Sequence, residues 1–144
     1  MPAFQFNEQP LICGTDMDFE FALYDEDEAP VALSAPDVVS AVLSQLQGGT
    51  ATLVITSDDE LDGGSTIEIE ELGSVGNPDP DDDVPASGVI KFRRADTEEI
   101  PDDDEWAAAM QEKLYFLLLK VAYQATDLVK PAGRGRLRLS RTAS

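Results

Sequence analysis

The chain has 144 residues, of which 42% are hydrophobic, with a mean hydropathy of −0.20 and a formal net charge of −19. This composition predicts one soluble globular domain over residues 1–144 and excludes a disordered chain. The longest apolar run, Leu114–Leu119, is far shorter than the roughly 20 residues of a membrane helix. Histidine is absent and Cys13 is the only cysteine, which excludes Ser-His-Asp and Cys-His catalytic sites and an intrachain disulfide. The first residues lack the basic segment and the long apolar segment of a signal peptide, so we expect none.

The charges are unevenly distributed along the chain. Residues 1–90 contain 20 acidic residues and no Lys or Arg, whereas all 10 basic residues lie in 91–144 together with nine acids. Because so acidic a surface repels phosphates, we expect neither a nucleic-acid nor a membrane partner. The charge instead favours solubility, a saline environment or a basic protein surface as partner.

Alternating apolar and polar residues predict strands in the first part of the chain. Met17–Leu23 alternates strictly, which is typical of a half-buried strand whose acids face water. Residues 3–6, "AFQF", predict a short first strand, and residues 31–34 a short extended segment. Residues 36–47 fit two interpretations. Ser34 as a helix N-cap favours a helix that ends at Gly48, whereas the β-branched residues favour a strand.

The middle of the chain predicts further strands at 50–56, 65–72 and 88–94, separated by turn residues. A long acidic loop is expected over 73–87, which is rich in Gly, Pro and Asp. Aspartates precede an alanine run near residue 106, and acids stabilise a helix N-terminus, so a short helix is expected over about 103–111.

The segment Glu112–Tyr123 is apolar on nearly every side and fits either a strand buried on both faces or the end of one long helix from Trp106. Six or seven short strands with turns between them indicate an all-β sandwich, and a sandwich needs central strands. We therefore prefer the strand, forming a hairpin with residues 128–141. Pro131 and the glycines after it predict a bend or bulge there.

The order of these segments is similar to that of a known family. Gly14–Tyr24, Pro30–Ser34, Val38–Leu46 and Thr50–Thr56 come first, followed by Leu114–Tyr123 and Gly135–Ser140. This pattern resembles the N-terminal immunoglobulin-like domain of phage upper-baseplate proteins. The resemblance implies an Ig-like antiparallel β-sandwich with one short inserted helix. It also implies a structural adaptor that docks a receptor-binding or fibre protein onto a larger ring.

Candidate metal ligands are confined to acidic turns. Asp58, Glu60 and Asp62 alternate before Gly63 like the start of a calcium loop. The twelfth position of that loop is Ile69 instead of the bidentate glutamate, so the motif fails and we expect no metal or other cofactor. Calcium at this loop, or at the other acidic turns 25–28 and 77–83, is the alternative.

The basic cluster near the end of the chain is the main candidate interface. Arg134, Arg136 and Arg138 alternate with leucines, which places several guanidinium groups on one strand face, and Arg141 follows. Arg93 and Arg94 lie upstream. Either these arginines contact acids of a neighbouring copy, or they form an ordinary exposed strand face. Nucleic-acid binding is the third alternative, which the negative charge of the rest of the molecule opposes. Tyr115 and Tyr123 are the aromatic candidates for the same interface.

Together with the absence of a catalytic motif, this resemblance implies a non-enzymatic structural virion protein of a tailed phage, at the tail, baseplate or fibre attachment, assembled in the bacterial cytoplasm. Its expected partners are other virion proteins and further copies of itself in a ring. One alternative is a capsid decoration or head–tail connector protein. An alternative of another class is an acidic DNA-mimic inhibitor of a basic enzyme, which the first 90 residues favour and the arginines oppose.

Overall fold

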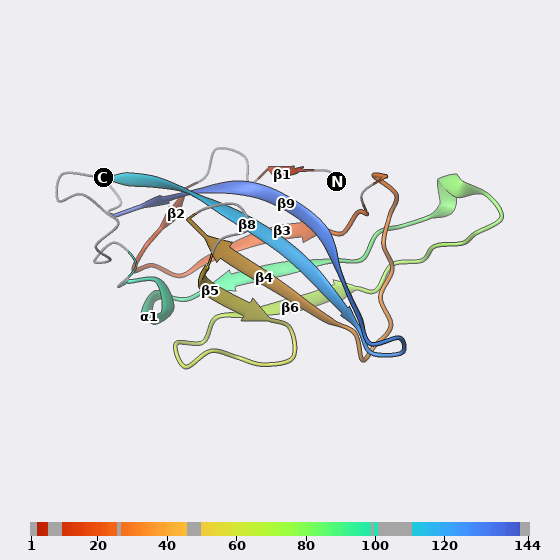
Figure 1. Ribbon diagram of the computed structural model, residues 1–144, viewed down its shortest axis with the longest axis horizontal. Coiled ribbons are helices and arrows are strands. Elements are labelled where there is room, and N and C mark those ends of the chain that lie inside the picture. Colours follow the sequence, from red (N-terminus) through yellow and green to blue (C-terminus); the bar gives the residue numbers. More distant parts are fainter. Residues whose placement is uncertain are drawn as a thin grey trace.

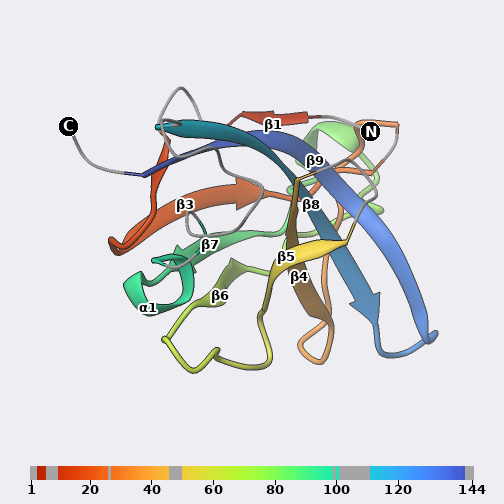
Figure 2. The same cartoon turned by 60° about the vertical axis from the view of Figure 1, so that its left-hand side comes forward.

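Two β-sheets pack face to face in the computed structural model, which describes residues 3–5, 10–25, 27–45, 50–98, 100 and 111–141 (Figures 1 and 2). The large sheet has the order β1-β9-β8-β4-β5, and β2 also pairs with β9. Its strands are β1 (Ala3–Gln5), β2 (Leu11–Ile12), β4 (Val38–Ser44), β5 (Ala51–Thr56), β8 (Glu112–Tyr123) and β9 (Leu128–Ser140). The small sheet has the order β3-β7-β6, with β3 (Met17–Ala22), β6 (Thr66–Glu71) and β7 (Ser87–Phe92).

This architecture confirms the predicted all-β sandwich. Glu112–Tyr123 is one strand, so the prediction of a strand here is confirmed and the alternative of a long helix is wrong. The strand interpretation of residues 36–47 is also confirmed, over Val38–Ser44. The sheets are not purely antiparallel, because β1 and β2 both run parallel to β9.

The helical segments differ from the prediction. Residues 101–110 lie outside the described residues, and they include all of the helix expected at about 103–111 except its last residue. That residue, Gln111, is not helical. A one-turn α-helix, α1, instead spans Arg94–Thr97, so the strand expected to reach residue 94 ends at Phe92. A 3-10 turn, η1, spans Pro80–Asp82 inside the predicted acidic loop. That loop extends away from the sandwich at the right of Figure 1.

The β8–β9 hairpin contains the predicted bulge. Leu119 pairs with Gly133 and Lys120 with Pro131, which leaves Ala132 as the extra residue in β9. Pro131 has no backbone N–H to donate, so an irregular position beside a bulge accommodates it.

The core lies between the sheets and is formed by the inward-facing residues of each strand. Phe19 of β3 and Phe92 of β7 make an edge-to-face contact with ring centroids 5.6 Å apart. From the large sheet, alternate residues of β8 from Tyr115 to Val121 are at most 1% exposed. The other side of each strand therefore forms the two outer faces of the molecule.

Candidate protein-interaction face

Arg136 and Arg138 of β9 project from the outer face of the large sheet. Arg136 and Arg138 are exposed, whereas Leu137 and Leu139 between and after them are buried in the core. Period-two alternation of β9 produces this separation. Arg134 pairs with Leu118 in the β8–β9 ladder, and its side chain lies outside the described part of the chain.

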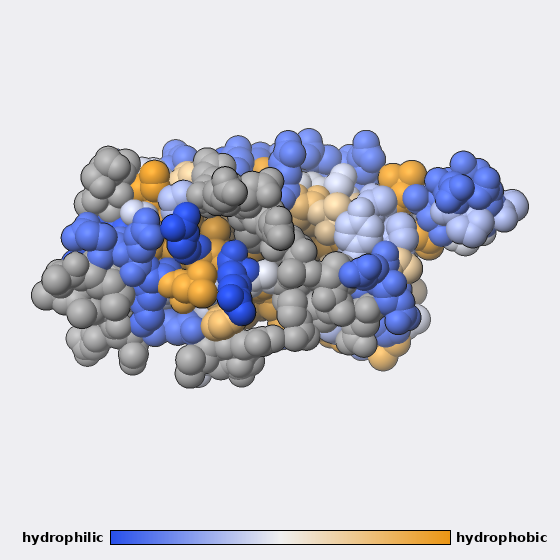
Figure 3. Space-filling view, turned by 90° about the horizontal axis from the view of Figure 1, so that it is seen from above, coloured by the Kyte–Doolittle hydropathy of each residue, from blue (hydrophilic) through white to orange (hydrophobic). Residues whose placement is uncertain are grey.

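An apolar row of β8 lies beside these arginines. Leu114 is directly opposite Arg138, and Phe116 is directly opposite Arg136. Opposite residues of an antiparallel pair share one face, so both rows lie on the same outer surface. We call this surface the arginine face; it consists of Leu114, Phe116, Leu118, Arg136 and Arg138. Figure 3 shows apolar surface next to strongly hydrophilic side chains on this side of the molecule.

The apolar surface continues onto the neighbouring strands. Val42 of β4 is opposite Leu118, and Val54 of β5 is opposite Val42. Leu114 is 43% exposed and Val54 41% exposed, while Phe116, Leu118 and Val42 are half-buried. Residues 38–57, which include β4 and β5, contain no charged residue. Aliphatic, aromatic and arginine side chains are the types enriched in protein interfaces.

Glu112 at the start of β8 lies next to this face. Its carboxylate lies 3.5 Å from the guanidinium of Arg138, and both side chains are about half exposed. Such an exposed ion pair contributes little stability, so Arg138 can exchange this partner for another carboxylate. No ion pair joins Arg136 to any residue that the structure describes.

The other predicted interface residues lie elsewhere. Tyr115 was expected on an exposed contact surface, but it is fully buried in the core. Tyr123 ends β8 and is partly buried; burial and the nearby charges of Asp37 and Asp25 raise the pKa of its hydroxyl. Arg141 follows β9, and its backbone N–H donates to the Gln111 carbonyl at 2.8 Å.

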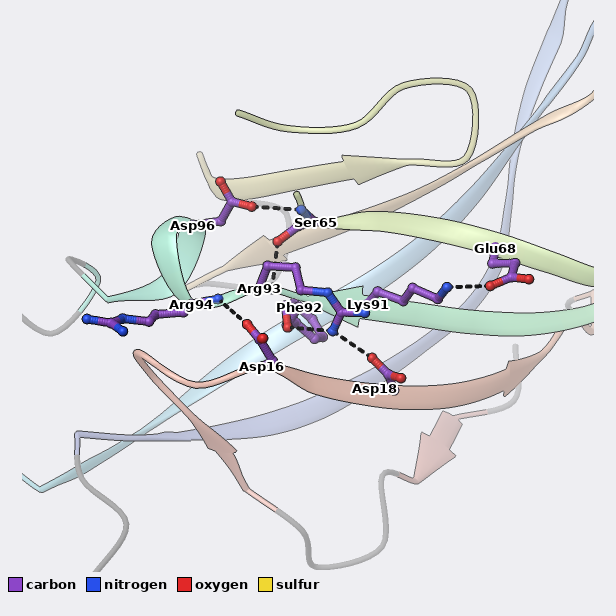
Figure 4. Close-up of polar contacts among 9 residues, drawn as sticks. All are labelled: Asp16, Asp18, Ser65, Glu68, Lys91, Phe92, Arg93, Arg94 and Asp96. Carbon is purple, nitrogen blue, oxygen red and sulfur yellow. Dashed lines mark hydrogen bonds and ion pairs between the residues drawn. The ribbon is translucent and has the colours of Figure 1, made fainter. Parts of the chain in front are cut away.

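Arg93 and Arg94 do not join the arginine face, because they follow β7 of the small sheet (Figure 4). The guanidinium of Arg93 lies 2.8 Å from the Asp18 carboxylate, and Lys91 forms an ion pair with Glu68. These pairs offset part of the negative charge on the outer face of the small sheet.

Two further aspartates in Figure 4 hold loops in place. Asp96 accepts hydrogen bonds from the backbone N–H groups of Gly63 and Ser65, at 3.0 and 2.9 Å. Asp16 accepts from the backbone N–H of Arg94 at the start of α1. Neither role could be predicted from the sequence, because the partners lie more than 30 residues apart and no local pattern indicates them.

The candidate calcium ligands do not converge. Asp58, Glu60 and Asp62 are all exposed in the loop between β5 and β6. Among the described residues, no three His, Cys, Asp or Glu side chains come close enough together to hold a metal ion. In the turn at 25–28, Asp25 accepts backbone hydrogen bonds from Asp27 and Ala29.

A shallow groove of about 680 Å³ lies between the start of β4 and β6. Its walls combine apolar side chains with the Lys91–Glu68 pair and the carboxylates of Asp37 and Asp58. Both carboxylate oxygens of Asp37 accept backbone N–H groups, from Ser34 and Gln124. These two hydrogen bonds hold the Asp37 side chain in place at one end of the groove.

No protein-family model matches this sequence, and comparisons with curated proteins and with solved structures give no match. None of the helices that the structure describes is long and apolar enough to cross a membrane.

Proposed function

We propose that this chain is a non-enzymatic structural subunit that docks a partner protein through the arginine face. The observation that supports this most is the register of β8 and β9, which places exposed arginines beside an apolar row on one sheet surface. Such a surface contributes affinity through apolar burial, while the guanidinium groups select acidic partners and set the docking register.

The particular assembly we propose is a tailed phage particle, with this chain at the tail, baseplate or fibre attachment. The resemblance of the segment order to the Ig-like domain of upper-baseplate proteins supports this proposal. A rigid sandwich suits the role, since it holds a docking surface at a fixed angle to the rest of the subunit. The proposal needs no metal, cofactor or catalytic group.

Quantitative mass spectrometry of purified particles from the source lysate tests this proposal. The amount of the chain is normalised to the major capsid protein. We expect a copy number in a small multiple of three or six, as in a tail or baseplate ring. Hundreds of copies favour the capsid decoration alternative. Absence from particles contradicts a virion role and favours the acidic inhibitor.

A further inference from the structure

A second exposed surface lies on the loop between β6 and β7. We call residues 72–85 of this loop the acidic arm. Ser74 and Val84 pair across the arm, and each backbone N–H donates to the other's carbonyl at 2.8 Å. The side-chain amide of Asn77 donates to Asp82 and Asp83 near the tip. These bonds give the arm one defined shape, although it extends away from the sandwich (Figure 1).

The arm combines aliphatic and acidic groups. Leu72, Val75 and Val84 are 44%, 46% and 44% exposed, which makes them three of the most exposed large apolar residues that the structure describes. Exposed aliphatic side chains gathered on one projecting segment indicate a contact surface.

The carboxylates at the tip of the arm divide into two pairs. Asp79 and Asp83 accept hydrogen bonds inside the arm, from Asp81 N–H and from Asn77. The exposed carboxylates of Asp81 and Asp82 make no hydrogen bond or ion pair with the described residues. They are therefore available to guanidinium groups of another molecule.

The acidic arm and the arginine face have complementary chemistry but lie at opposite ends of the molecule. The arm is at the right of Figure 1, whereas the start of β8 and the end of β9 are at the left. The two surfaces therefore cannot meet within one chain. A second copy offers both the cations and the apolar row that the arm lacks.

We propose that the acidic arm of one copy docks on the arginine face of the next. Asp81 and Asp82 then pair with Arg136 and Arg138, and the aliphatic side chains of the arm cover the apolar row of β8. Apolar burial is needed here because two chains of net charge −19 repel each other at long range. The contact is heterologous, so repeated copies close into a ring or extend as a chain. This inference rests on the proposed function, since it names an occupant for the same face.

Sedimentation velocity of the full chain at rising concentration tests this inference. We expect species larger than a monomer that increase with concentration. Asp81→Arg/Asp82→Arg and Arg136→Asp/Arg138→Asp should each weaken self-association by about tenfold or more, because each places like charges in the contact. An equimolar mixture of the two variants should associate again, since the reversed arm of one fits the reversed face of the other.

Asp58→Arg/Asp62→Arg is the matched control for the arm variant, because it makes the same change in net charge on an exposed loop outside both surfaces. It should associate at least as well as the unmodified chain. Circular dichroism checks that every variant keeps its β-structure. A chain that stays monomeric at all concentrations, a control as impaired as the arm variant, or a mixture that does not recover would each overturn the inference.

The outcomes separate this inference from the proposed function. If the chain is present in particles but monomeric in solution, the proposed structural role stands and the arm contact is contradicted. A chain that self-associates by charge swap but is absent from particles keeps the arm contact and contradicts the virion role.

Discussion

Phe116 and Arg136 lie directly opposite each other in the β8–β9 ladder and share the outer face of the large sheet. The same strands place Leu117 and Leu137 in the core on the other side. One hairpin therefore builds both the interior of the sandwich and its candidate docking surface. Mutations along β8 can separate these two roles, because neighbouring residues point to opposite sides.

Leu117→Ala and Leu114→Ala should differ strongly in their effect on stability. Leu117 is 1% exposed and Leu114 is 43% exposed in the same strand. Removal of the buried side chain leaves a cavity, so we expect a loss of about 2–5 kcal/mol for Leu117→Ala and below about 1 kcal/mol for Leu114→Ala. Urea unfolding followed by circular dichroism measures both. Equal losses would show that β8 is not packed as described.

Asp96→Ala should destabilise the protein by about 1.5–3 kcal/mol, since two backbone N–H groups of the β5–β6 loop lose a charged acceptor. Asp62→Ala is the control, because Asp62 is exposed in the same loop and its loss should cost less than about 0.5 kcal/mol. Urea unfolding compares the two variants. If their free energies of unfolding agree, Asp96 does not anchor the loop.

Gly73→Ala should distort the acidic arm more than Gly76→Ala. Both glycines have positive φ, of 78° and 77°. A Cβ at Gly73 would come within 2.6 Å of backbone atoms of Val84 and Ala86, whereas a Cβ at Gly76 meets nothing within 4 Å. We expect a cost of about 1 kcal/mol at Gly76 from its φ alone, and at least about 2 kcal/mol at Gly73.

Self-association is a second property in which the two glycine variants should differ. Gly73→Ala should also weaken self-association in sedimentation velocity, because the arm no longer holds its shape, while Gly76→Ala should retain most of it. Thermal unfolding supplies the stability comparison. The reverse order of the two variants in either measurement contradicts the described geometry of the arm.

Cys13 should make stability fall with pH in the alkaline range. Burial raises the pKa of its thiol from the ordinary value of 9.0 to about 11. Above pH 9 the unfolded chain loses this proton while the folded chain keeps it. The free energy of unfolding therefore decreases as pH rises from 9 to 11, by up to about 2–3 kcal/mol. Cys13→Ala should remove this component. Identical pH dependence of the two proteins between pH 9 and 11 would falsify it.

The fold was predictable wherever one face of a strand is polar. Met17–Ala22 and Thr66–Glu71 alternate in sequence because one side meets the core and the other meets water. Glu112–Tyr123 lacks that signal, since its outer face is itself apolar. Only the need of a sandwich for central strands favoured the strand at that position.

The candidate site was predictable in part. The alternation of arginines and leucines placed Arg136 and Arg138 on one exposed face, but the apolar row beside them depends on the β8–β9 register. Tyr115, a candidate for the interface, is buried in the core, and the apolar residues on both sides of β8 give no local signal of which side faces inward. The parallel pairing of β1 and β2 with β9, and the anchoring role of Asp96, arise from long-range contacts that no local pattern contains.

The most direct test of the central claim is competitive incorporation into particles. Tagged copies of Arg136→Ser/Arg138→Ser and of a control, Arg94→Ser/Lys130→Ser, each compete with the unmodified chain during infection. The control removes the same number of exposed cations from outside the arginine face, so net charge is matched. We expect the control to enter particles like the unmodified chain and the face variant to be largely excluded. Equal incorporation of the two variants would contradict docking through the arginine face.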